Sequence, residues 1–340
     1  MTLEVLAGGL QTTVQDLGRF GYRHLGVGVA GALDGYSARV GNLLAGNPEN
    51  FAMLEIALHG PRLRFHRAAR IAITGAELDA QADGIAVAGW RQVDLPAGCE
   101  LVLGPCRRGA RAYLAIAGGI QVTPVLGSAS TDLRAAFGGV SGRCLVAGDL
   151  LPLADTSPVG AADQTFVCWK PAAIPNPATL PTLPTPAPWW LNPEPDLDFK
   201  HHTPIRLLPG RDAVVPATAL CSDAYRVSAH SNRQGLRLQG PPLTLVDRRE
   251  RLSEPVAPGT VQLPPDGQPI VLLGEAQTIG GYPRIGHVIA ADLPRLAQLR
   301  PGDTLHFEMI DAPTAHALAC AQRQRLTRMA LAIEQRRRES

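Results

Sequence analysis

The chain reads Gly274-Glu275-Ala276-Gln277-Thr278-Ile279-Gly280-Gly281-Tyr282-Pro283-Arg284-Ile285-Gly286-His287 in the stretch that decides its fold. This stretch follows an apolar run, residues 269–273, which is typical of a buried strand bounded by turn residues. Consecutive glycines let a backbone approach a ligand closely, and Arg284 adds a planar fork suited to carboxylate or phosphate. The stretch therefore predicts a binding site for a small anion. The alternative is a tight turn between two strands.

The composition favours many short strands joined by turns. Charged residues make up only 18% of the 340 residues, below the usual quarter, while 35 Gly and 30 Pro exceed average usage. This length is sufficient for two domains with sizeable cores. The formal net charge of +2 is too small to indicate a nucleic-acid-binding protein.

The sequence lacks the usual signals of export, membrane insertion or metal binding. It contains no apolar run of about 18 residues, so no segment is expected to span a membrane. Residues 1–4 carry no basic region ahead of an apolar stretch, so we expect no signal peptide and a cytoplasmic protein. The six cysteines form no Cys-x-x-Cys pair, and the histidines show no ligand spacing. We expect free, mostly buried thiols and no metal.

Two β-rich halves are expected. Residues 1–154 form an N-terminal half of short apolar runs, each closed by Gly, Pro or Asp, with one helix over residues 35–44. Residues 203–311 form a C-terminal half of the same character, in which residues 302–307 alternate and predict the closing hairpin strand. Such spacing is typical of a β-barrel or sandwich.

Two further segments differ from these halves in composition. Residues 155–202 are crowded with proline and predict a linker or a strap over the surface, which the Trp189-Trp190 pair would pin to a domain or to a partner. Residues 312–340 predict a C-terminal helix, because its apolar residues fall on one face.

Arginines and one carboxylate are the side chains most suggestive of a site. Arg19, Arg23, Arg233 and Arg284 each lie in a glycine-bearing loop, where they either converge on an anion or fix the loop through backbone carbonyls. Glu55 lies within an apolar run, and an internal carboxylate of that kind is either functional or locked to an arginine. The sequence has no phosphate loop, no dinucleotide fingerprint and no Gly-x-Ser-x-Gly motif.

Taken together and in order, the glycine-rich segments resemble the biotin-dependent carboxyltransferase family, also called allophanate hydrolase subunit 2. The family includes the C subunit of bacterial 5-oxoprolinase, the KipA regulator and part of the carboxyltransferase region of urea carboxylase. The matching segments are residues 12–19, 31–34, 111–120, 126–128, 231–235, 258–264, 267–270 and 277–283. Ahead of Gly280, residues 275–279 depart from the Asp-Arg-Gln-Thr-Thr that is usual in the family.

The resemblance implies a mainly β, cyclophilin-like β-barrel architecture. It implies a component like the C subunit of an ATP-dependent 5-oxoprolinase, a hydrolase that opens 5-oxoproline to glutamate. Activity would require two partners, a KipI-like protein of the B-subunit type and a protein of the A-subunit type, with ATP and nucleotide binding supplied through the complex. One alternative is carboxyl transfer from carboxybiotin to a urea-like amide, with biotin on another polypeptide because the chain lacks Met-Lys-Met. The other is a non-catalytic KipA-like regulator that binds a KipI-like partner.

The resemblance also supplies candidates for the substrate pocket. Arg19 and Arg284 would hold an anion, Gln277 and Asn232 would orient an amide, and Tyr282 would donate a hydrogen bond. Asp16 is the sixth candidate. No catalytic residue is assigned.

Overall fold

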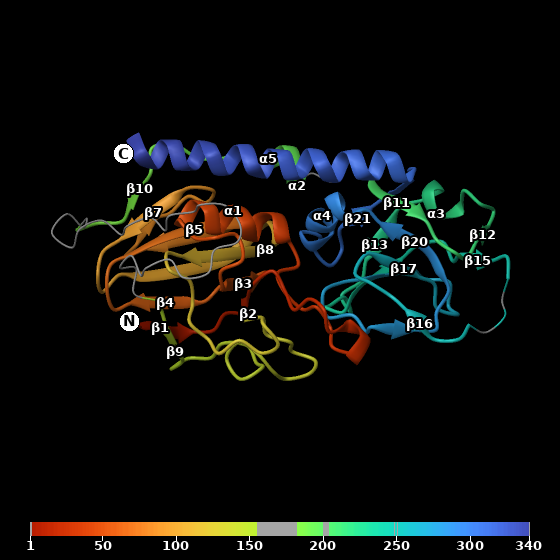
Figure 1. The fold of residues 1–340 in the computed structure, drawn as a ribbon, viewed down its shortest axis with the longest axis horizontal. Coiled ribbons are helices and arrows are strands. Elements are labelled where there is room, and N and C mark those ends of the chain that lie inside the picture. The colour runs from red at the N-terminus through yellow and green to blue at the C-terminus, as the bar shows by residue number, and fades with distance from the viewer. Residues whose placement is uncertain (1, 155–181, 200–203, 248, 250, 340) are drawn as a thin grey trace. The chain divides into compact units, whose positions relative to one another are not determined.

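The structure is a computed structural model that describes residues 2–154, 182–199, 204–247, 249 and 251–339 (Figure 1). The chain divides into two compact units. The first comprises Met1–Gly18, Gly35–Pro193 and Met329–Ser340, and the second comprises Arg19–Asp34 and Glu194–Arg328. The segment Arg19–Asp34 therefore belongs to the second unit, although both of its neighbours along the chain belong to the first.

A ten-stranded antiparallel sheet forms the first unit in the described part of the chain. The strands are β1 (Thr2–Ala7), β2 (Gln11–Gln15), β3 (Met53–Ala57), β4 (Arg62–Phe65), β5 (Ala69–Ala82), β6 (Ile85–Ala86), β7 (Gln92–Leu95), β8 (Glu100–Ile116), β9 (Leu150–Pro152) and β10 (Thr185–Pro186). The long strands β5 and β8 pair from Ile71–Ile116 to Ala82–Leu101. Leu54, Ile71 and Leu114 are among the fully buried apolar residues of the core of this unit.

Helix α1 (Gly35–Ala45) confirms the helix expected over residues 35–44. It lies against β5 and β8. A Cβ atom on Gly41 would stand 2.7 Å from the Thr74 hydroxyl of β5, so glycine permits this close approach. Thr74 in turn donates its hydroxyl to the Ser37 carbonyl at 2.7 Å, which satisfies a buried polar group.

The carboxylate of Glu55 is fixed by hydrogen bonding and by an arginine. This agrees with the second of the two alternatives that the sequence left open, a functional carboxylate or one locked to an arginine. Glu55 is only 3% exposed, and its Oε2 accepts a hydrogen bond of 2.9 Å from the Tyr113 hydroxyl. The Arg111 guanidinium lies 3.9 Å from Oε1. All three residues are on the paired strands β3 and β8. A buried charge with a hydrogen bond and a counter-ion is the arrangement that makes burial tolerable.

Part of the proline-rich segment is bonded to the first unit. The amide of Ala187 donates to the Gln92 carbonyl at 2.9 Å, and that of Leu191 donates to the Trp90 carbonyl at 2.9 Å. Trp190 itself is 58% exposed. Residues 155–181 and 200–202 of the predicted strap lie outside the described residues.

The second unit contains an eight-stranded sheet in the order β21-β13-β14-β18-β17-β20-β11-β22, counted over the described residues. Its strands are β11 (Ile205–Pro209), β13 (Tyr225–Val227), β14 (Gly235–Gln239), β17 (Thr260–Gln262), β18 (Ile270–Leu272), β20 (Arg284–Val288), β21 (Thr304–Leu305) and β22 (Phe307–Met309). Two smaller pairs join β12 (Val214–Val215) to β15 (Thr244–Leu245) and β16 (Glu254–Pro255) to β19 (Ile279–Gly280). The core includes Leu207, Tyr225, Val261 and Val271.

The second unit also contains short helical elements. They are η1 (Arg23–Leu25), α2 (Glu194–Leu197), α3 (Ala219–Ser222), η3 (Ala290–Asp292) and α4 (Leu293–Ala297). In the described part of the chain, the helices other than α1 and the C-terminal helix are short, and the mainly β fold that the sequence predicted is confirmed.

The prediction of one hairpin strand over residues 302–307 was wrong. Strand β21 pairs antiparallel with β13, whereas β22 runs parallel to β11. The chain changes partner at His306, whose carbonyl accepts the Ile205 amide at 2.8 Å. The alternating pattern survives this change, because Leu305 and Phe307 on either side of His306 are both buried.

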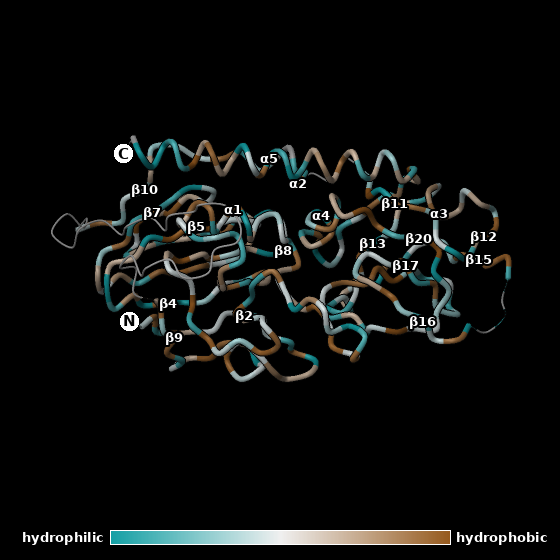
Figure 2. The backbone as a smooth tube through the Cα atoms, in the orientation of Figure 1, coloured by the Kyte–Doolittle hydropathy of each residue, from teal (hydrophilic) through white to brown (hydrophobic). Residues whose placement is uncertain are grey.

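Helix α5 (Ala312–Glu339) confirms the predicted C-terminal helix. Hydrophobic and hydrophilic residues alternate along its length (Figure 2). Leu326 and Ile333, one heptad apart, are 5% and 1% exposed, as expected for one buried stripe. In the described part of the chain, no helix is long and apolar enough to cross a membrane.

Candidate binding site on the second unit

The stretch that follows β18 is anchored by a buried ion pair. Arg233 and Glu275 are each 3% exposed at their side chains, and Nε of the arginine lies 2.5 Å from Oε1 of the glutamate. Arg233 also donates through Nη2 to the Gly31 carbonyl at 2.8 Å. Glu275, in the lead-in that departs from the family pattern, thus neutralises an arginine from another glycine-rich loop. The glutamate has a structural role.

Gly274 allows this stretch to lie directly on the segment 19–34. Its carbonyl accepts the Ala30 amide at 3.0 Å. A Cβ atom on Gly274 would stand 2.8 Å from Cδ2 of Leu33 and 2.9 Å from the Ala30 oxygen. This glycine is needed for close approach of two backbones, because no larger residue fits without displacing them.

Two side-chain amides meet opposite Gly280. Gln262, at the end of β17, is 1% exposed, and its Oε1 accepts a hydrogen bond of 3.3 Å from Nε2 of Gln277. Nε2 of Gln262 has no hydrogen-bond partner among the described residues. A Cβ atom on Gly280 would lie 2.7 Å from Nε2 of Gln262 and 3.3 Å from Nε2 of Gln277. Glycine at residue 280 therefore lets the backbone pack directly against the two amide groups.

The neighbouring polar residues lie on the same pair of strands. Thr260 of β17 is opposite His287 of β20, and the Thr260 hydroxyl is 3.3 Å from Nδ1 of His287. Burial lowers the pKa of His287, so its imidazole is neutral at neutral pH. Arg23 of η1 donates to the Val256 carbonyl, and burial lowers the pKa of its guanidinium.

An open groove lies next to these residues. Its volume is about 610 Å³, within the range typical of small-molecule sites. The lining residues are Pro242, Leu243, Thr244, Leu245, Arg249, Arg251, Leu263, Pro264, Pro265, Asp266, Gly267, Gly281, Tyr282 and Pro283. A second cavity of about 310 Å³ shares Arg249 and Arg251 with it. The groove therefore combines an apolar wall with two cationic side chains.

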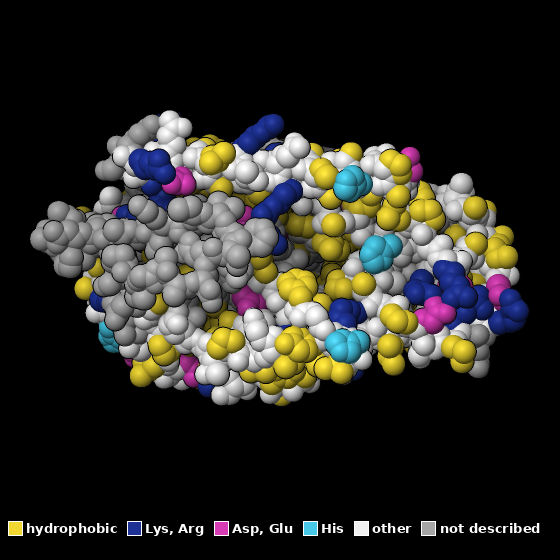
Figure 3. All heavy atoms as spheres, viewed as in Figure 1, with side chains coloured by type: hydrophobic (Ala, Val, Ile, Leu, Met, Phe, Trp, Pro, Cys, Tyr) yellow, Lys and Arg dark blue, Asp and Glu magenta, His cyan; other side chains and the backbone are white. Residues whose placement is uncertain are grey.

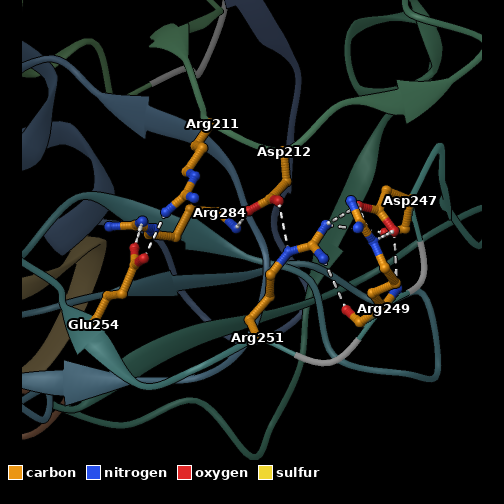
Figure 4. A network of polar contacts seen from close by, with 7 residues as sticks. All are labelled: Arg211, Asp212, Asp247, Arg249, Arg251, Glu254 and Arg284. Atoms are coloured by element: carbon orange, nitrogen blue, oxygen red, sulfur yellow. Dashed lines mark hydrogen bonds and ion pairs between the residues drawn. The ribbon is translucent and has the colours of Figure 1, made fainter.

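Charged side chains at this end of the second unit form a continuous network (Figure 4). Glu254 pairs with both Arg211 and Arg284. Asp212 accepts the Arg284 amide at 2.8 Å and Nε of Arg251 at 3.0 Å, which connects the two halves of the network. Dark blue and magenta side chains gather at the right of the view in Figure 3, in the region where Figure 1 labels β15 and β16.

The network extends to Asp247, whose carboxylate accepts a hydrogen bond from Arg249 and forms an ion pair with Arg251. The Arg249 bonds hold the pKa of Asp247 well below its usual range, and the Arg211 bond lowers the pKa of Glu254 in the same way. Each of these carboxylates is therefore ionised at neutral pH. Four arginines share three carboxylates in this network, so it carries one net positive charge.

Three of the predicted site residues lie close together in the second unit. Gln277 contacts Gln262, Tyr282 lines the groove and is 48% exposed, and Arg284 begins β20. The Arg284 guanidinium donates to the Pro255 carbonyl at 3.3 Å and pairs with Glu254. These contacts fix the loop that contains β16. An anion-holding role for Arg284 stays a prediction.

Asn232 and Arg19 also belong to the second unit. Asn232 is exposed, and its Oδ1 accepts the Gln234 amide at 2.8 Å, which closes a tight turn. Arg19 is completely buried, and its backbone amide donates to the Val29 carbonyl at 2.7 Å. Their roles toward a ligand stay predictions as well.

Asp16 belongs to the first unit, at the end of β2. Its carboxylate accepts hydrogen bonds from the Gly18 amide at 2.8 Å, the Ser128 hydroxyl at 2.7 Å and the Ala129 amide at 2.7 Å, and from the Ser130 hydroxyl. Ser128 is only 1% exposed. This carboxylate holds the loop around Ser128 in place, an arrangement that does not present the serine as a nucleophile.

Thr260 and Gln262 lie in one of the segments that match the family, but the sequence alone assigned them no role. The signal was present in the order Thr260-Val261-Gln262. Val261 is fully buried in the core, so its two neighbours point to the opposite face of the strand. Both are nevertheless buried, at 4% and 1% exposure. A buried threonine and glutamine on one strand face mark a polar site beneath the surface.

No group of three or more His, Cys, Asp or Glu side chains in the described residues is placed to hold a metal ion. The five cysteines within them are free, but only Cys99 and Cys106 are buried, and Cys320 is exposed. The expectation of mostly buried thiols was therefore wrong. Cys168 lies outside the described residues. Burial raises the pKa of Cys99 to about 12, so this thiol is unreactive.

The fold and these loops define a family. The family model described as carboxyltransferase domain, subdomain A and B, matches residues 25–309, and the chain belongs to this family. The resemblance noted from the sequence motifs is thereby confirmed.

Named relatives fall into two groups. The chain is 39% identical over 310 residues to the C subunit of 5-oxoprolinase from Escherichia coli K12, with 90% of each chain covered. It is 34% identical over 330 residues to the protein of that name from Haemophilus influenzae, covering 93% of this chain and 94% of that one. It is also 29% identical to urea amidolyase of Saccharomyces cerevisiae over 340 residues, which cover 94% of this chain but only 17% of the amidolyase.

Solved structures share the fold. The crystal structure of TTHA0988 matches with a TM-score of 0.74 and 36% identity, and the match covers 90% of this chain and 56% of that one. The Kluyveromyces lactis urea amidolyase matches with a TM-score of 0.78 and 29% identity, covering 96% of this chain. This chain thus spans just over half the length of TTHA0988 and 20% of the amidolyase.

Proposed function

We propose that this protein is the counterpart of the C subunit in an ATP-dependent 5-oxoprolinase, which opens the lactam of 5-oxoproline to give glutamate. One observation carries the proposal. The chain is 39% identical to the C subunit of 5-oxoprolinase from Escherichia coli, and the match covers 90% of both chains. The urea amidolyases, by contrast, are matched over only a small part of their length.

The polar site of the second unit fits a small amide. Gln262 and Gln277 present amide nitrogens, Tyr282 lines the adjoining groove, and His287 is neutral. A lactam has one carbonyl oxygen that accepts hydrogen bonds, and it is a poor electrophile. Donors aimed at that oxygen stabilise the negative charge that develops there when the amide is attacked.

ATP would supply the driving force by phosphorylating the lactam oxygen, which creates a leaving group. We assign ATP binding to the complex rather than to this chain, because its sequence carries neither a phosphate loop nor a dinucleotide fingerprint. The proposal therefore includes two partners, a KipI-like protein of the B-subunit type and a protein of the A-subunit type. We propose a cytoplasmic location for the complex, where ATP is available.

The test is reconstitution. The chain is purified alone and together with A-type and B-type partner proteins, and glutamate formation from 5-oxoproline is measured with and without ATP. We expect ATP-dependent glutamate formation by the complex and none by the chain alone. A stable reconstituted complex that forms no glutamate would refute the proposal.

Carboxyl transfer from carboxybiotin to a urea-like amide is the second candidate. It is supported by the 30% identity to the urea amidolyase of Lachancea kluyveri over 94% of this chain. The same reconstitution separates the candidates: this activity would require bicarbonate and a biotinylated carrier protein and would consume urea, while 5-oxoproline would remain intact.

A further inference from the structure

We propose that the groove beside Tyr282 and the smaller cavity next to it form one binding site for a small molecule that carries a single carboxylate on an uncharged ring. Arg211 and Arg249 are the groups that would bind the carboxylate. The inference rests on the proposed function, because 5-oxoproline is a molecule of this class and serves as the probe. It assigns the carboxylate to different arginines from Arg19 and Arg284, which the sequence suggested.

The two cavities share one wall. Arg249 and Arg251 line both the groove of about 610 Å³ and the cavity of about 310 Å³, and all the lining residues belong to the second unit. The groove supplies an apolar surface that includes Leu243, Leu263 and the ring of Tyr282. The smaller cavity is lined by three arginines and two aspartates. A ligand beside the shared arginines therefore meets an apolar surface at one end and guanidinium groups at the other.

Hydrogen bonds between its walls hold the groove in shape. The Leu263 amide donates to the Pro283 carbonyl at 2.9 Å, and the Leu243 amide donates to the Gly267 carbonyl at 3.0 Å. A Cβ atom on Gly267 would stand 2.9 Å from the Leu243 oxygen, so these two segments lie in close contact. Walls fixed in this way can bind a ligand without the entropic cost of ordering a loop.

The carboxylates beside the cavity are occupied within the charged network (Figure 4). Asp212 accepts hydrogen bonds from Nε of Arg251 at 3.0 Å and from the Arg284 amide at 2.8 Å. Asp247 accepts the Arg249 amide at 3.0 Å through Oδ1 and Nη2 of Arg249 at 2.7 Å through Oδ2. The guanidinium of Arg251 is also fully used, because Nη1 and Nη2 donate to the backbone carbonyls of Arg249 and Asp247 at 2.9 and 3.2 Å. These groups hold the loop in place.

Two arginines keep N–H groups for a ligand. Arg211 donates through Nη1 to Glu254 at 2.5 Å, and its Nε and Nη2 have no partner among the described residues. Arg249 uses Nε and Nη2 for Asp247, and its Nη1 has no partner in the same part of the chain. Both side chains line the smaller cavity. Their remaining N–H groups can therefore donate to the oxygens of a carboxylate.

The charge of the network favours a carboxylate over a phosphate. Four arginines and three carboxylates leave one net positive charge, which a monocarboxylate neutralises. A multiply charged phosphate would leave an excess of negative charge beside Asp212 and Asp247. Asp266 on the groove wall would repel a second negative charge on the body of the ligand. The apolar groove is therefore suited to an uncharged ring.

The experiment compares two lactams that differ only in the carboxylate. Binding of 5-oxoproline and of 2-pyrrolidinone to the full chain is measured by ligand-detected NMR, with inorganic phosphate as a competitor. The variants are Arg211→Gln, Arg249→Gln and the double variant, and the Tm of each is measured alongside. Arg237→Gln is the matched control, because Arg237 is exposed on β14 of the same unit and lines neither cavity.

We expect 5-oxoproline to bind about tenfold more tightly than 2-pyrrolidinone, and added salt to weaken only the binding of 5-oxoproline, since the arginines are open to solvent. Each single variant should weaken 5-oxoproline binding about three- to tenfold, the loss of one charge-assisted hydrogen bond reduced by exposure. The affinity for 2-pyrrolidinone should not change, and Arg237→Gln should bind both lactams as the wild type does. In the reconstituted complex, Arg249→Gln should raise KM for 5-oxoproline, with kcat changed less.

Three results would overturn the inference. The first is a failure of the chain to bind 5-oxoproline more tightly than 2-pyrrolidinone. The second is wild-type affinity for 5-oxoproline in the double variant when its Tm is unchanged. The third is displacement of 5-oxoproline by an equal concentration of inorganic phosphate, which would assign the cavity to phosphate. A complex that forms no glutamate would refute the proposed function instead, and the comparison of the two lactams on the chain alone would still decide the site.

Discussion

Replacing Glu275 by glutamine removes the charge that neutralises a buried arginine. Arg233 and Glu275 are each 3% exposed and lie 2.5 Å apart from Nε to Oε1. Breaking a buried pair from one side costs about 3–5 kcal/mol, because the remaining charge is left in a medium of low dielectric constant. Glutamine retains one acceptor oxygen, so we expect a loss at the lower end, about 3 kcal/mol.

The assay is thermal unfolding followed by calorimetry, with urea unfolding as an independent measurement. For a unit of this size each kcal/mol lowers Tm by about 2–4 °C, so Glu275→Gln should lower the Tm of the second unit by about 6–12 °C. The control is Arg211→Gln, which breaks an ion pair of the same 2.5 Å length but with side chains 66% and 38% exposed. Exposed pairs contribute about 0–1 kcal/mol, so this variant should melt close to the wild type.

A loss below about 1 kcal/mol in Glu275→Gln would refute the reasoning, because it would show that the Arg233 charge is stabilised without its carboxylate. The double variant Arg233→Met/Glu275→Leu provides a further check. It removes both charges and should recover most of the stability that Glu275→Gln loses.

Three further changes test other features of the structure. Gly274→Ala should lower the free energy of unfolding in urea by about 1–3 kcal/mol, because the added methyl group would meet Leu33 and the Ala30 carbonyl. The control Gly35→Ala, with no heavy atom within 4 Å of the new Cβ, should leave stability unchanged. Equal losses in the two variants would contradict the packing argument. Tyr113→Phe should cost about 1.5–3 kcal/mol, since the buried Glu55 carboxylate loses its 2.9 Å hydrogen bond. An unchanged midpoint in urea would show that this hydrogen bond does not stabilise the fold. Burial lowers the pKa of His287 below its ordinary value of 6.5, so the unfolded chain binds this proton more readily and stability should fall as pH drops through and below 6.5. Substitution by glutamine should flatten the pH dependence of Tm between about pH 7 and 5, and an unaltered slope would exclude His287 as its source.

Much of the fold follows from local pattern. The apolar run ahead of Gly274 predicted a buried strand, and β18 lies there. Residues 35–44 predicted a helix, and α1 begins at the expected residue. The alternation over residues 302–307 located a strand correctly but gave the wrong pairing, because period-two burial is identical in a hairpin and in a strand that changes partner at His306.

The candidate site could be predicted only in part. The sequence drew attention to Gln277, Tyr282 and Arg284, which the structure does place in one region of the second unit. It gave no indication that Arg284 forms an ion pair with Glu254. It also gave no indication that Nε2 of Gln262 is buried without a hydrogen-bond partner among the described residues. Both facts depend on partners distant in sequence, and local periodicity carries no information about them.

The sequence by itself determined the family, the mainly β class and the glycine positions, because these depend on residue type and on short-range spacing. The tertiary structure decided which side chains face one another. It placed the segment 19–34 in the second unit, neutralised Arg233 with Glu275, and set two amides opposite Gly280. Such choices follow from the burial of polar groups, which must find partners wherever the folded chain provides them.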